Sequence, residues 1–337
     1  MGKGFGIKIT KNIVYSIFNP GEKCWGPLII KDYNDKEFWA SPRSCALNYG
    51  VGIIEGLKAF RHKTGEIFLF RPDENAKRFN RSLEMIYVPI FPEEKFLEAV
   101  NLLVKSNSGF VPEHRNGTLY IRPVMYGNDQ LGYSLDPEIS YTAAFWCSPV
   151  GKYYGDDFGA MSLWLENEIV RAVPRGTGSI KASANYLLSR IANAKAKKNS
   201  CQETIFLDAK DRKYVEETGG TNIFLVKDGI LSTPSLEQST ILAGITRKSI
   251  IFLAKEELGL EIQERNIAKE ELFFADEVFL CGTAAVITPV GSIKDENGFH
   301  FIFDGQAGKI TKTLYNTLTG IQCGDIEDKY RWLLRID

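Results

Sequence analysis

Residues 203–234, ETIFLDAKDRKYVEETGGTNIFLVKDGILSTP, contain several short runs of β-forming side chains. Polar breaks at AKDR and KDG separate these runs, which is typical of hairpins in an antiparallel sheet. Helical patterns occur before and after this stretch, but strands and helices do not alternate as strictly as in a parallel βαβ protein. The chain is therefore predicted to be an α+β protein rather than a doubly wound one.

The length of the chain predicts two domains. With 337 residues, of which 44% are hydrophobic, it can bury a large core. We expect a small amino-terminal α/β domain over residues 1–148 and a large carboxy-terminal domain over residues 160–337, which would carry Lys181. The Gly-, Asp- and Tyr-rich stretch GKYYGDDFG predicts a linker or flap over residues 149–159. We expect a cleft between the two domains, since small-molecule sites commonly lie in such clefts.

The local patterns predict several individual elements. Helices are expected where apolar residues recur at helical spacing or a start signal occurs, and strands where short apolar runs are bounded by turn residues. The predicted helices cover residues 71–86, 92–107 and 309–319, with others after Lys181 and Gly244. The predicted strands include residues 66–71, 117–127, 141–150, 161–170 and 277–290.

Charge and cysteine usage exclude several classes of protein. The formal net charge is −1, so there is no electrostatic case for nucleic acid or an anionic membrane. No apolar run approaches the roughly 18–20 residues that span a bilayer. The six cysteines are scattered singly and only three histidines occur, so we expect no metal site. Without a signal-peptide pattern, the expectation is a reduced cytoplasmic enzyme.

The stretch RGTGSIKASANYLL places Lys181 among glycines, alanines and serines. It is not a dinucleotide fingerprint, because Lys181 fills the position of the third glycine, and it is not a P-loop, because Ile180 and Ala182 flank the lysine. Lys181 could be an ordinary lysine at a helix start. It could also be a Schiff-base lysine, whose small neighbours let a flat cofactor approach the backbone.

Other residues supply the remaining parts of a cofactor site, although each is ambiguous alone. In LAGITRKSII, Ile245 and Thr246 open a helix whose free N–H groups suit a phosphate, or Thr246 simply caps that helix. Arg78 could be a solvated helix residue and Glu217 a hairpin surface charge. Together, a lysine, a phosphate cradle, an arginine and a carboxylate form the set that pyridoxal 5'-phosphate (PLP) requires.

Six blocks in order carry a resemblance to a known family: RPDENAKRFNRS, LYIRPVMYG, KASANY after GTG, YVEETGGTN, GITR and GTAAVITPV. The sequence resembles the branched-chain amino acid aminotransferases of the fold-type IV group of PLP enzymes. The likeness runs from ALNYGVGIIEGLKAFR to GIQCGDIEDKYRW, which is most of the chain. It implies a homodimer with shared active sites and transamination of leucine, isoleucine and valine with 2-oxoglutarate, giving 2-oxo acids and L-glutamate.

The resemblance also implies roles for the cofactor site. Lys181 would bind PLP through a Schiff base and shuttle the α-proton of the substrate. Glu217 would face the pyridine nitrogen, and Tyr186 would bond the ring oxygen. The phosphate would be held by four residues: Arg78, Ile245, Thr246 and Thr283.

Substrate contacts are implied in the same way. Arg122 would bind the distal carboxylate of 2-oxoglutarate, because a planar guanidinium suits a carboxylate. The turn at Thr283 would offer backbone donors to the α-carboxylate. The residues implied on the substrate side are Tyr49, Ile54, Tyr120, Arg122, Tyr153, Thr283, Ala284 and Ala285.

At four positions the residue differs from the one that is usual in the motifs of this family, namely Ile54, Ser179, Ala243 and Arg331. Ile54 stands where the family commonly has a phenylalanine in the side-chain pocket, so a wider pocket is an alternative. Another fold-type IV enzyme, a D-amino acid aminotransferase or an aminodeoxychorismate lyase, is the alternative function, and a binding protein without turnover is a further one.

Overall fold

The computed structural model describes residues 8, 10–34, 41–128, 139–151, 159–298, 300–302 and 307–337. These residues form two compact units. The amino-terminal unit comprises the described residues within Phe5–Lys152, Ile180–Ala184 and Gln322–Asp337. The carboxy-terminal unit comprises those within Tyr153–Ser179 and Asn185–Ile321. The chain therefore enters the amino-terminal unit three times, and one of these passages carries Lys181.

The amino-terminal unit is built on a nine-stranded sheet, counted over the described residues, with the order β18-β6-β5-β7-β8-β1-β2. β3 also pairs with β1, and β4 pairs with β7; every pairing in this sheet is antiparallel. The strands are β1 (Asn12–Asn19), β2 (Cys24–Trp25), β3 (Ile29–Asp32), β4 (Gly52–Ile54), β5 (Leu57–Arg61), β6 (Ile67–Phe70), β7 (Thr118–Gly127), β8 (Tyr141–Val150) and β18 (Leu333–Arg335).

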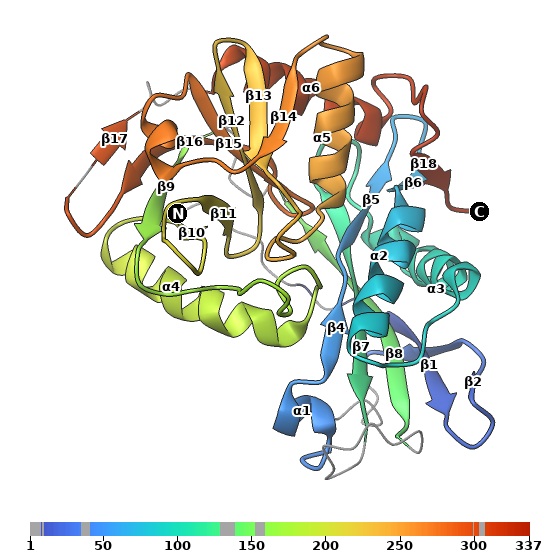
Figure 1. Ribbon diagram of the computed structural model, residues 1–337. Coiled ribbons are helices and arrows are strands. Elements are labelled where there is room, and N and C mark those ends of the chain that lie inside the picture. Colours follow the sequence, from blue (N-terminus) through green and yellow to red (C-terminus); the bar gives the residue numbers. More distant parts are fainter. Residues whose placement is uncertain are drawn as a thin grey trace. The chain divides into compact units, whose positions relative to one another are not determined.

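Two helices, α2 (Pro72–Met85) and α3 (Glu93–Ser106), pack on each other, and α3 also packs on β1 and β8 (Figure 1). α2 begins with a proline whose fixed φ suits the first turn, followed by two acidic residues that favour the helix N-terminus. The short helix α1 (Cys45–Tyr49) is capped by the side chain of Ser44 and ends at Gly50, which has a φ of 69°. A 3₁₀ turn, Ser108–Phe110, follows α3.

Aromatic rings form the centre of the amino-terminal core. Phe96 on α3 lies 5.5 Å from Phe79 on α2 and 5.4 Å from Phe145 on β8, measured between ring centroids. Phe91 adds a fourth ring, 5.8 Å from Phe145. Offset and edge-on rings at these distances attract one another beyond their simple burial. The rings therefore fix α2 and α3 against the sheet that carries part of the candidate site.

The carboxy-terminal unit contains a second nine-stranded sheet, again counted over the described residues, with the order β11-β10-β9-β16-β15-β12-β13-β14 and with β17 on β16. β9 pairs in parallel with β10 and β16, and β13 pairs in parallel with β14, while the other pairings are antiparallel. The strands are β9 (Met161–Glu166), β10 (Glu203–Leu207), β11 (Val215–Thr218), β12 (Asn222–Lys227), β13 (Ile230–Pro234), β14 (Ile262–Arg265), β15 (Glu277–Gly282), β16 (Val286–Lys294) and β17 (His300–Ile302).

The described residues of this unit include the helices α4 and α5 and nearly all of α6. α4 (Tyr186–Lys198) packs on β9 and β10, and α5 (Ile245–Glu256) packs on β14 and β15 (Figure 1). α6 (Lys309–Cys323) has its first N–H groups satisfied by Glu277, whose carboxylate accepts from Ile310 N at 3.0 Å and from Thr311 N at 2.8 Å. A carboxylate at a helix N-terminus is favourable because of the helix dipole. A short 3₁₀ helix lies at Lys269–Phe273, and another, Ser183–Asn185, lies where the chain passes from the amino-terminal unit into this one.

Several predicted elements differ from the structure. The strand predicted over 277–290 is two strands, β15 and β16, joined by a turn at Thr283–Ala285, because the small residues of GTAA form a hairpin turn. The predicted hairpins are present between β10 and β11 and between β12 and β13. In addition, β10 pairs in parallel with β9, and α4 lies between these two strands in the sequence. β18 was not predicted, because its short sequence carries no strand pattern of its own.

The predicted linker over residues 149–159 lies mostly outside the described residues, which include only its two ends. No helix within the described ranges is long and apolar enough to cross a membrane.

Candidate active site

The backbone of Lys181 is hydrogen-bonded on both sides within the amino-terminal unit. Its N–H donates to Ser82 Oγ on α2 at 3.2 Å, and its carbonyl accepts from Ile54 N on β4 at 3.0 Å. Next to it, Ala182 forms an antiparallel bridge with Ile53. The half-buried lysine is thus held by residues that lie 99 or more positions earlier in the chain. Such an anchored backbone is suited to aiming one side chain.

The small residues around Lys181 have a packing role in the structure. A Cβ on Gly52 would lie 3.2 Å from Ser183 Oγ, and one on Gly50 would lie 3.4 Å from the Cβ of Ala184. A Cβ on Gly178 would clash with the Thr240 carbonyl. Close approach of backbone segments therefore explains several of these residues, in addition to the cofactor access that the sequence suggested.

Arg78, predicted to bind phosphate, is paired with a carboxylate that the sequence analysis did not single out. Its Nε donates to Glu55 Oε1 at 2.7 Å and its Nη2 donates to Glu55 Oε2 at 2.9 Å. Both side chains are buried, and that of Glu55 is completely inaccessible. Ser82 Oγ donates to the Arg78 carbonyl at 3.0 Å, so one hydroxyl connects the backbones of Arg78 and Lys181.

Two further donors complete the surroundings of Glu55. Asn75 Nδ2 donates to Oε2 at 2.7 Å, and Gly56 N donates to the same oxygen at 3.0 Å. Burial acts to raise the pKa of Glu55, but the charge and hydrogen bonds of Arg78, together with the Lys181 ammonium, hold that pKa below its usual value. The Lys181 amine therefore belongs to the same electrostatic group as Glu55 and Arg78.

The predicted substrate residues Tyr120 and Arg122 both lie on β7. Arg122 Nη2 donates to Tyr120 Oη at 2.7 Å, and the guanidinium carbon lies 5.3 Å from the centre of the tyrosine ring. Arg122 Nε is buried without a hydrogen-bond partner in the described part of the chain. A Cβ on Gly56 would clash with the Tyr120 hydroxyl, so this glycine lets Tyr120 lie directly against the connection between β4 and β5 that carries Glu55. The structure thus brings Arg78, Tyr120 and Arg122 into one region.

Two other predicted residues have separate places in this unit. Ile54 is half-buried at the end of β4, opposite Val124 of β7. Tyr49 is the last residue of α1 and is 46% exposed. Tyr153, predicted to lie on the flap, falls outside the described residues.

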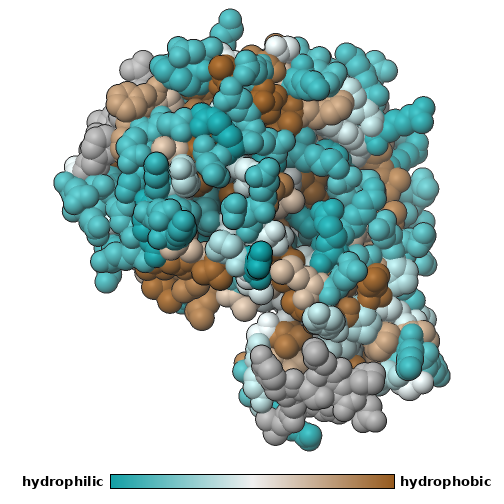
Figure 2. Space-filling model, viewed as in Figure 1, coloured by the Kyte–Doolittle hydropathy of each residue, from teal (hydrophilic) through white to brown (hydrophobic). Residues whose placement is uncertain are grey.

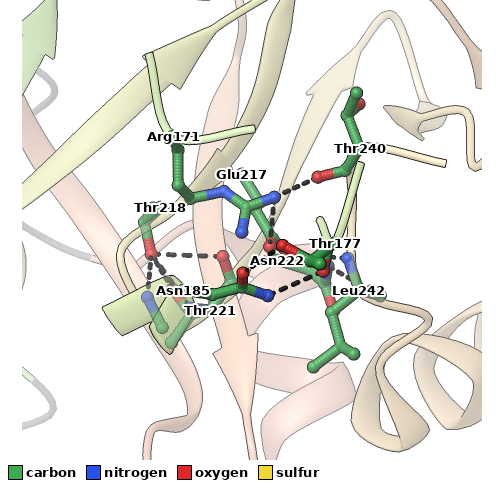
Figure 3. A network of polar contacts seen from close by, with 10 residues as sticks. Arg171, Thr177, Asn185, Glu217, Thr218, Thr221, Asn222, Thr240 and Leu242 are labelled. Carbon is green, nitrogen blue, oxygen red and sulfur yellow. Dashed lines mark hydrogen bonds and ion pairs between the residues drawn. The ribbon is translucent and has the colours of Figure 1, made fainter. Parts of the chain in front are cut away.

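Glu217 is the centre of a polar network in the carboxy-terminal unit (Figure 3). It lies on β11, is buried, and uses both carboxylate oxygens. Oε2 accepts from Asn222 Nδ2 at 3.0 Å and from Leu242 N at 3.3 Å. Oε1 is 3.0 Å from Nη2 of Arg171, which also donates to the Thr240 carbonyl. Three donors therefore hold Glu217 as an oriented carboxylate.

The N-terminus of α5 lies at the residues for which a phosphate cradle was predicted. Its N-cap is Gly244, and no side chain within the described ranges caps it. The buried residues Ile245 and Thr246 form its first turn, where backbone N–H groups have no intrahelical acceptor. A Cβ at Gly244 would clash with Asn222 Oδ1, which places this helix start next to the residue that also binds Glu217.

The remaining predicted residues also lie in the carboxy-terminal unit. Thr283, Ala284 and Ala285 form the turn between β15 and β16. Tyr186 is the first residue of α4 and is 37% exposed. No cluster of side chains suited to a metal ion occurs among the residues that the structure describes.

Comparison with known proteins identifies the family. The model of the amino-transferase class IV family matches residues 52–293. The chain belongs to this family. A Staphylococcus epidermidis protein named "probable branched-chain-amino-acid aminotransferase" is 42% identical over 99% of this chain and 93% of its own length. An Arabidopsis thaliana class IV relative, "branched-chain-amino-acid aminotransferase 3, chloroplastic", is also 42% identical, over 99% of this chain and 79% of its own.

Solved structures of class IV aminotransferases give the same result. The branched-chain amino acid aminotransferase of Escherichia coli has a TM-score of 0.82 and 30% identity, covering 97% of this chain and 100% of its own. The Thermobaculum terrenum enzyme, solved in its PLP form, has a TM-score of 0.81 and 27% identity, covering 98% and 99%. The predicted α+β fold of type IV and the predicted enzyme class, a branched-chain-amino-acid transaminase, are confirmed.

Four residues of this site were missed by the sequence analysis: Glu55, Asn75, Arg171 and Asn222. Glu55 lies in the short connection between β4 and β5, and a charged residue between two apolar strands could have marked it. Asn222 directly follows the GGT turn and lies on a buried strand, which is a weaker signal. Arg171 lies in an irregular segment after β9 and carries no local pattern.

Proposed function

We propose that the protein catalyses PLP-dependent transamination of L-leucine, L-isoleucine and L-valine with 2-oxoglutarate, producing 2-oxo acids and L-glutamate. The observation that carries the proposal is the anchoring of Lys181 between β4 and α2, beside the Glu55–Arg78 pair. A lysine fixed next to an oriented arginine suits covalent binding of a phosphorylated aldehyde.

The donors of this chain fit the parts of PLP. The uncapped N-terminus of α5, with Ile245 and Thr246, and the guanidinium of Arg78 would hold the phosphate. Glu217 is a fixed carboxylate that would accept the ring N–H, and Tyr186 would bond the ring oxygen. The Thr283 hydroxyl would add a phosphate contact. PLP, when bound, supplies an electron sink for the bonds at the substrate Cα.

The residues of this chain then bind substrate and move a proton. The Lys181 amine would carry the proton from and to the substrate Cα. Backbone donors in the turn formed by Thr283, Ala284 and Ala285 would hold the α-carboxylate. Arg122, whose Nε has no partner in the described structure, would receive the distal carboxylate of 2-oxoglutarate.

The other predicted residues would shape the substrate side. Ile54 and Tyr120 would form apolar walls for the branched side chain, with Tyr49 and Tyr153 as further walls. Because an aliphatic chain and a carboxylate must use one pocket in turn, an apolar wall with one arginine is a physically reasonable solution.

We further propose that the active form is a homodimer with shared active sites. Supporting this, α4 exposes a series of apolar side chains, and Figure 2 shows apolar surface over this helix. Leu187 is 63% exposed, Ile191 51% and Leu188 38%. Such a face is typical of a surface that another protein chain covers in the active molecule.

Light scattering tests the dimer. The double variant Leu187→Glu/Ile191→Glu should be a monomer in solution, and a wild-type protein that is fully active as a monomer would contradict the proposal. The predicted cytoplasmic location stays a prediction.

The experiment that tests the function labels the lysine directly. Wild-type protein loaded with PLP is reduced with sodium borohydride and mapped by peptide mass spectrometry, and Lys181→Ala is assayed with leucine and 2-oxoglutarate. We expect the label on Lys181 and no turnover by the variant with an unchanged circular dichroism spectrum. Lys77→Ala, at an exposed position of α2, is the control and should remain active. Label on another lysine, or activity only with D-amino acids, would refute the proposal.

A further inference from the structure

Arg171 is a buried arginine to which the proposed function gives no role. It is 8% exposed, and its Nη2 lies 3.0 Å from Glu217 Oε1 (Figure 3). The same nitrogen donates to the Thr240 carbonyl, which fixes the guanidinium in place. Its contact with the proposed site is therefore made through the carboxylate of Glu217.

Stability alone does not account for this ion pair. The cost of removing two charges from water roughly offsets their attraction, so buried ion pairs are weak stabilising devices. In the described part of the chain, Nε of Arg171 is buried with no hydrogen-bond partner, which adds a further cost. A function of Arg171 that depends on its charge explains why an arginine occupies this position.

We propose that Arg171 is a positioning residue that keeps Glu217 ionised and oriented toward the ring nitrogen of the cofactor. The inference rests on the proposed function, in which Glu217 accepts the ring N–H. Arg171 occupies Oε1, while Asn222 and Leu242 occupy Oε2. Donors on both oxygens leave the carboxylate little freedom to rotate.

The charge of Arg171 determines where the shared proton resides. A cation beside a carboxylate lowers the proton affinity of that carboxylate. With Glu217 kept ionised, a proton shared with the ring nitrogen would stay on that nitrogen, which supports the electron-accepting chemistry that the cofactor supplies when bound. Without Arg171, Glu217 would compete for this proton.

A second carboxylate near Arg171 provides an alternative that can be tested. Burial raises the pKa of Glu216, while a hydrogen bond from Thr240 and the charge of Arg171 act to lower it. Glu216 and Glu217 are consecutive strand residues, so their side chains point to opposite faces of the sheet. If Arg171 acted on Glu216 instead, Glu216→Gln would reproduce the effect of removing Arg171.

Ligand binding by the apoenzyme separates these possibilities. We would titrate it by calorimetry with pyridoxamine 5'-phosphate and with the analogue in which C–H replaces the ring nitrogen. Neither ligand reacts covalently with Lys181. For Arg171→Met we expect about 10- to 100-fold weaker binding of the natural compound, the loss typical of a charge-assisted hydrogen bond, but less than about threefold change for the analogue.

Control variants define the result. Arg247→Met removes another buried arginine of the same unit, which is paired with Glu264 at 2.7 Å, and should affect both ligands equally. Glu216→Gln should likewise change the affinity for both ligands equally. Arg171→Lys keeps the positive charge and should restore part of the preference for the natural compound over the analogue. Adding Arg171→Met to Glu217→Gln should cause little further loss, since both changes act through one carboxylate.

Three results would count against the inference or its premise. Equal weakening of both ligands by Arg171→Met would show that the arginine only supports the structure. If Glu216→Gln lost the preference for the natural compound over the analogue, Arg171 would act through Glu216 and not through Glu217. If the wild-type protein binds neither ligand, the proposed function itself fails, and this outcome is distinct from the other two.

Discussion

Arg78 and Glu55 are joined by two parallel hydrogen bonds, Nε to Oε1 at 2.7 Å and Nη2 to Oε2 at 2.9 Å. This bidentate geometry fixes the plane of the guanidinium as well as its position. The arginine proposed to bind phosphate is therefore oriented before any ligand arrives. Glu55 has no proposed contact with substrate, yet the orientation of Arg78 depends on it.

Replacing Glu55 by glutamine should destabilise the protein strongly. The variant keeps the size of the side chain but leaves the buried Arg78 charge without its counter-charge. Breaking a buried pair in this way costs about 3–5 kcal/mol. Urea unfolding at neutral pH measures the loss. The control is Asp73→Asn on α2, the helix that carries Arg78. It removes an exposed ion pair with Lys77 at 3.2 Å and should lower the free energy of unfolding by less than about 0.5 kcal/mol. A similar loss in both variants would contradict this prediction.

Because Lys58 is buried, we expect the free energy of unfolding of the protein to rise with pH. The residue is 8% exposed, and burial lowers the pKa of its amine to about 8, while the charge of Cys323 acts in the opposite direction. In the unfolded chain the pKa is about 10.4, so between about pH 8 and 10.4 the unfolded state binds more protons than the folded state. The free energy of unfolding should therefore increase with pH across this window. Below pH 8 both states are protonated, and the full cost of the buried charge applies.

The substitution Lys58→Met tests this relation. At pH 7 it removes a buried charge that costs about 3 kcal/mol, so the variant should be more stable than the wild type. The difference should shrink as the pH approaches 10, where folded wild-type protein carries a neutral amine. Urea unfolding at pH 7, 8, 9 and 10 gives the comparison, with the exposed Lys105→Met as control. A difference that is constant over this range would show that the charge of Lys58 is not responsible.

Arg122→Gln should separate the two substrates of the proposed reaction. Only 2-oxoglutarate brings a distal carboxylate, and the loss of a charge-assisted pair corresponds to about 1.5–3 kcal/mol, or roughly 10- to 100-fold in kcat/KM. The value for leucine should change far less. Arg61→Gln, on β5 of the same sheet, is the control, since its guanidinium bonds backbone carbonyls. Equal losses for both substrates would indicate that Arg122 only supports Tyr120, to which it donates at 2.7 Å.

Ile54→Phe should change the order of substrate preference. Isoleucine is shorter than a phenyl ring, so the pocket of the wild type should leave a gap beside small side chains. Valine should gain from the substitution relative to methionine and phenylalanine, by about tenfold in kcat/KM, as one methylene of packing is worth about 1–3 kcal/mol. The assay compares valine, leucine, methionine and phenylalanine in both proteins. An unchanged order would mean that a neighbouring side chain already fills the space.

Local patterns were sufficient to predict the elements that depend on local signals. The helix α2 begins at Pro72 as the acidic residues after it suggest, and β8 coincides with the predicted run Tyr141–Val150. The parallel pairing of β9 with β10 and the addition of β18 to β6 were not predicted, because they depend on contacts between segments distant in sequence. Register between distant strands has no local signal.

The candidate site shows the same limit. Lys181, Arg78 and Glu217 are each ambiguous alone, and they could be named because together they form a cofactor set and because their blocks resemble a known family, whereas their partners could not be named. Glu55 and Arg171 become recognisable only when folding places them beside Arg78 and Glu217. Whether a buried charged residue has a functional role depends on the group that it pairs with, and that partner is known only from the three-dimensional structure.

The pairing of β18 with β6 has a consequence for the folding of the protein. Leu333 lies opposite Phe70, and the Trp332 carbonyl accepts a hydrogen bond from Arg71 N at 2.7 Å, so this edge of the amino-terminal sheet joins segments that are far apart in the sequence. Contacts between distant segments carry a large loop-closure cost and slow folding. The sheet that anchors Lys181 is therefore completed late, and until then its β6 edge is open to chaperones or to pairing with another chain.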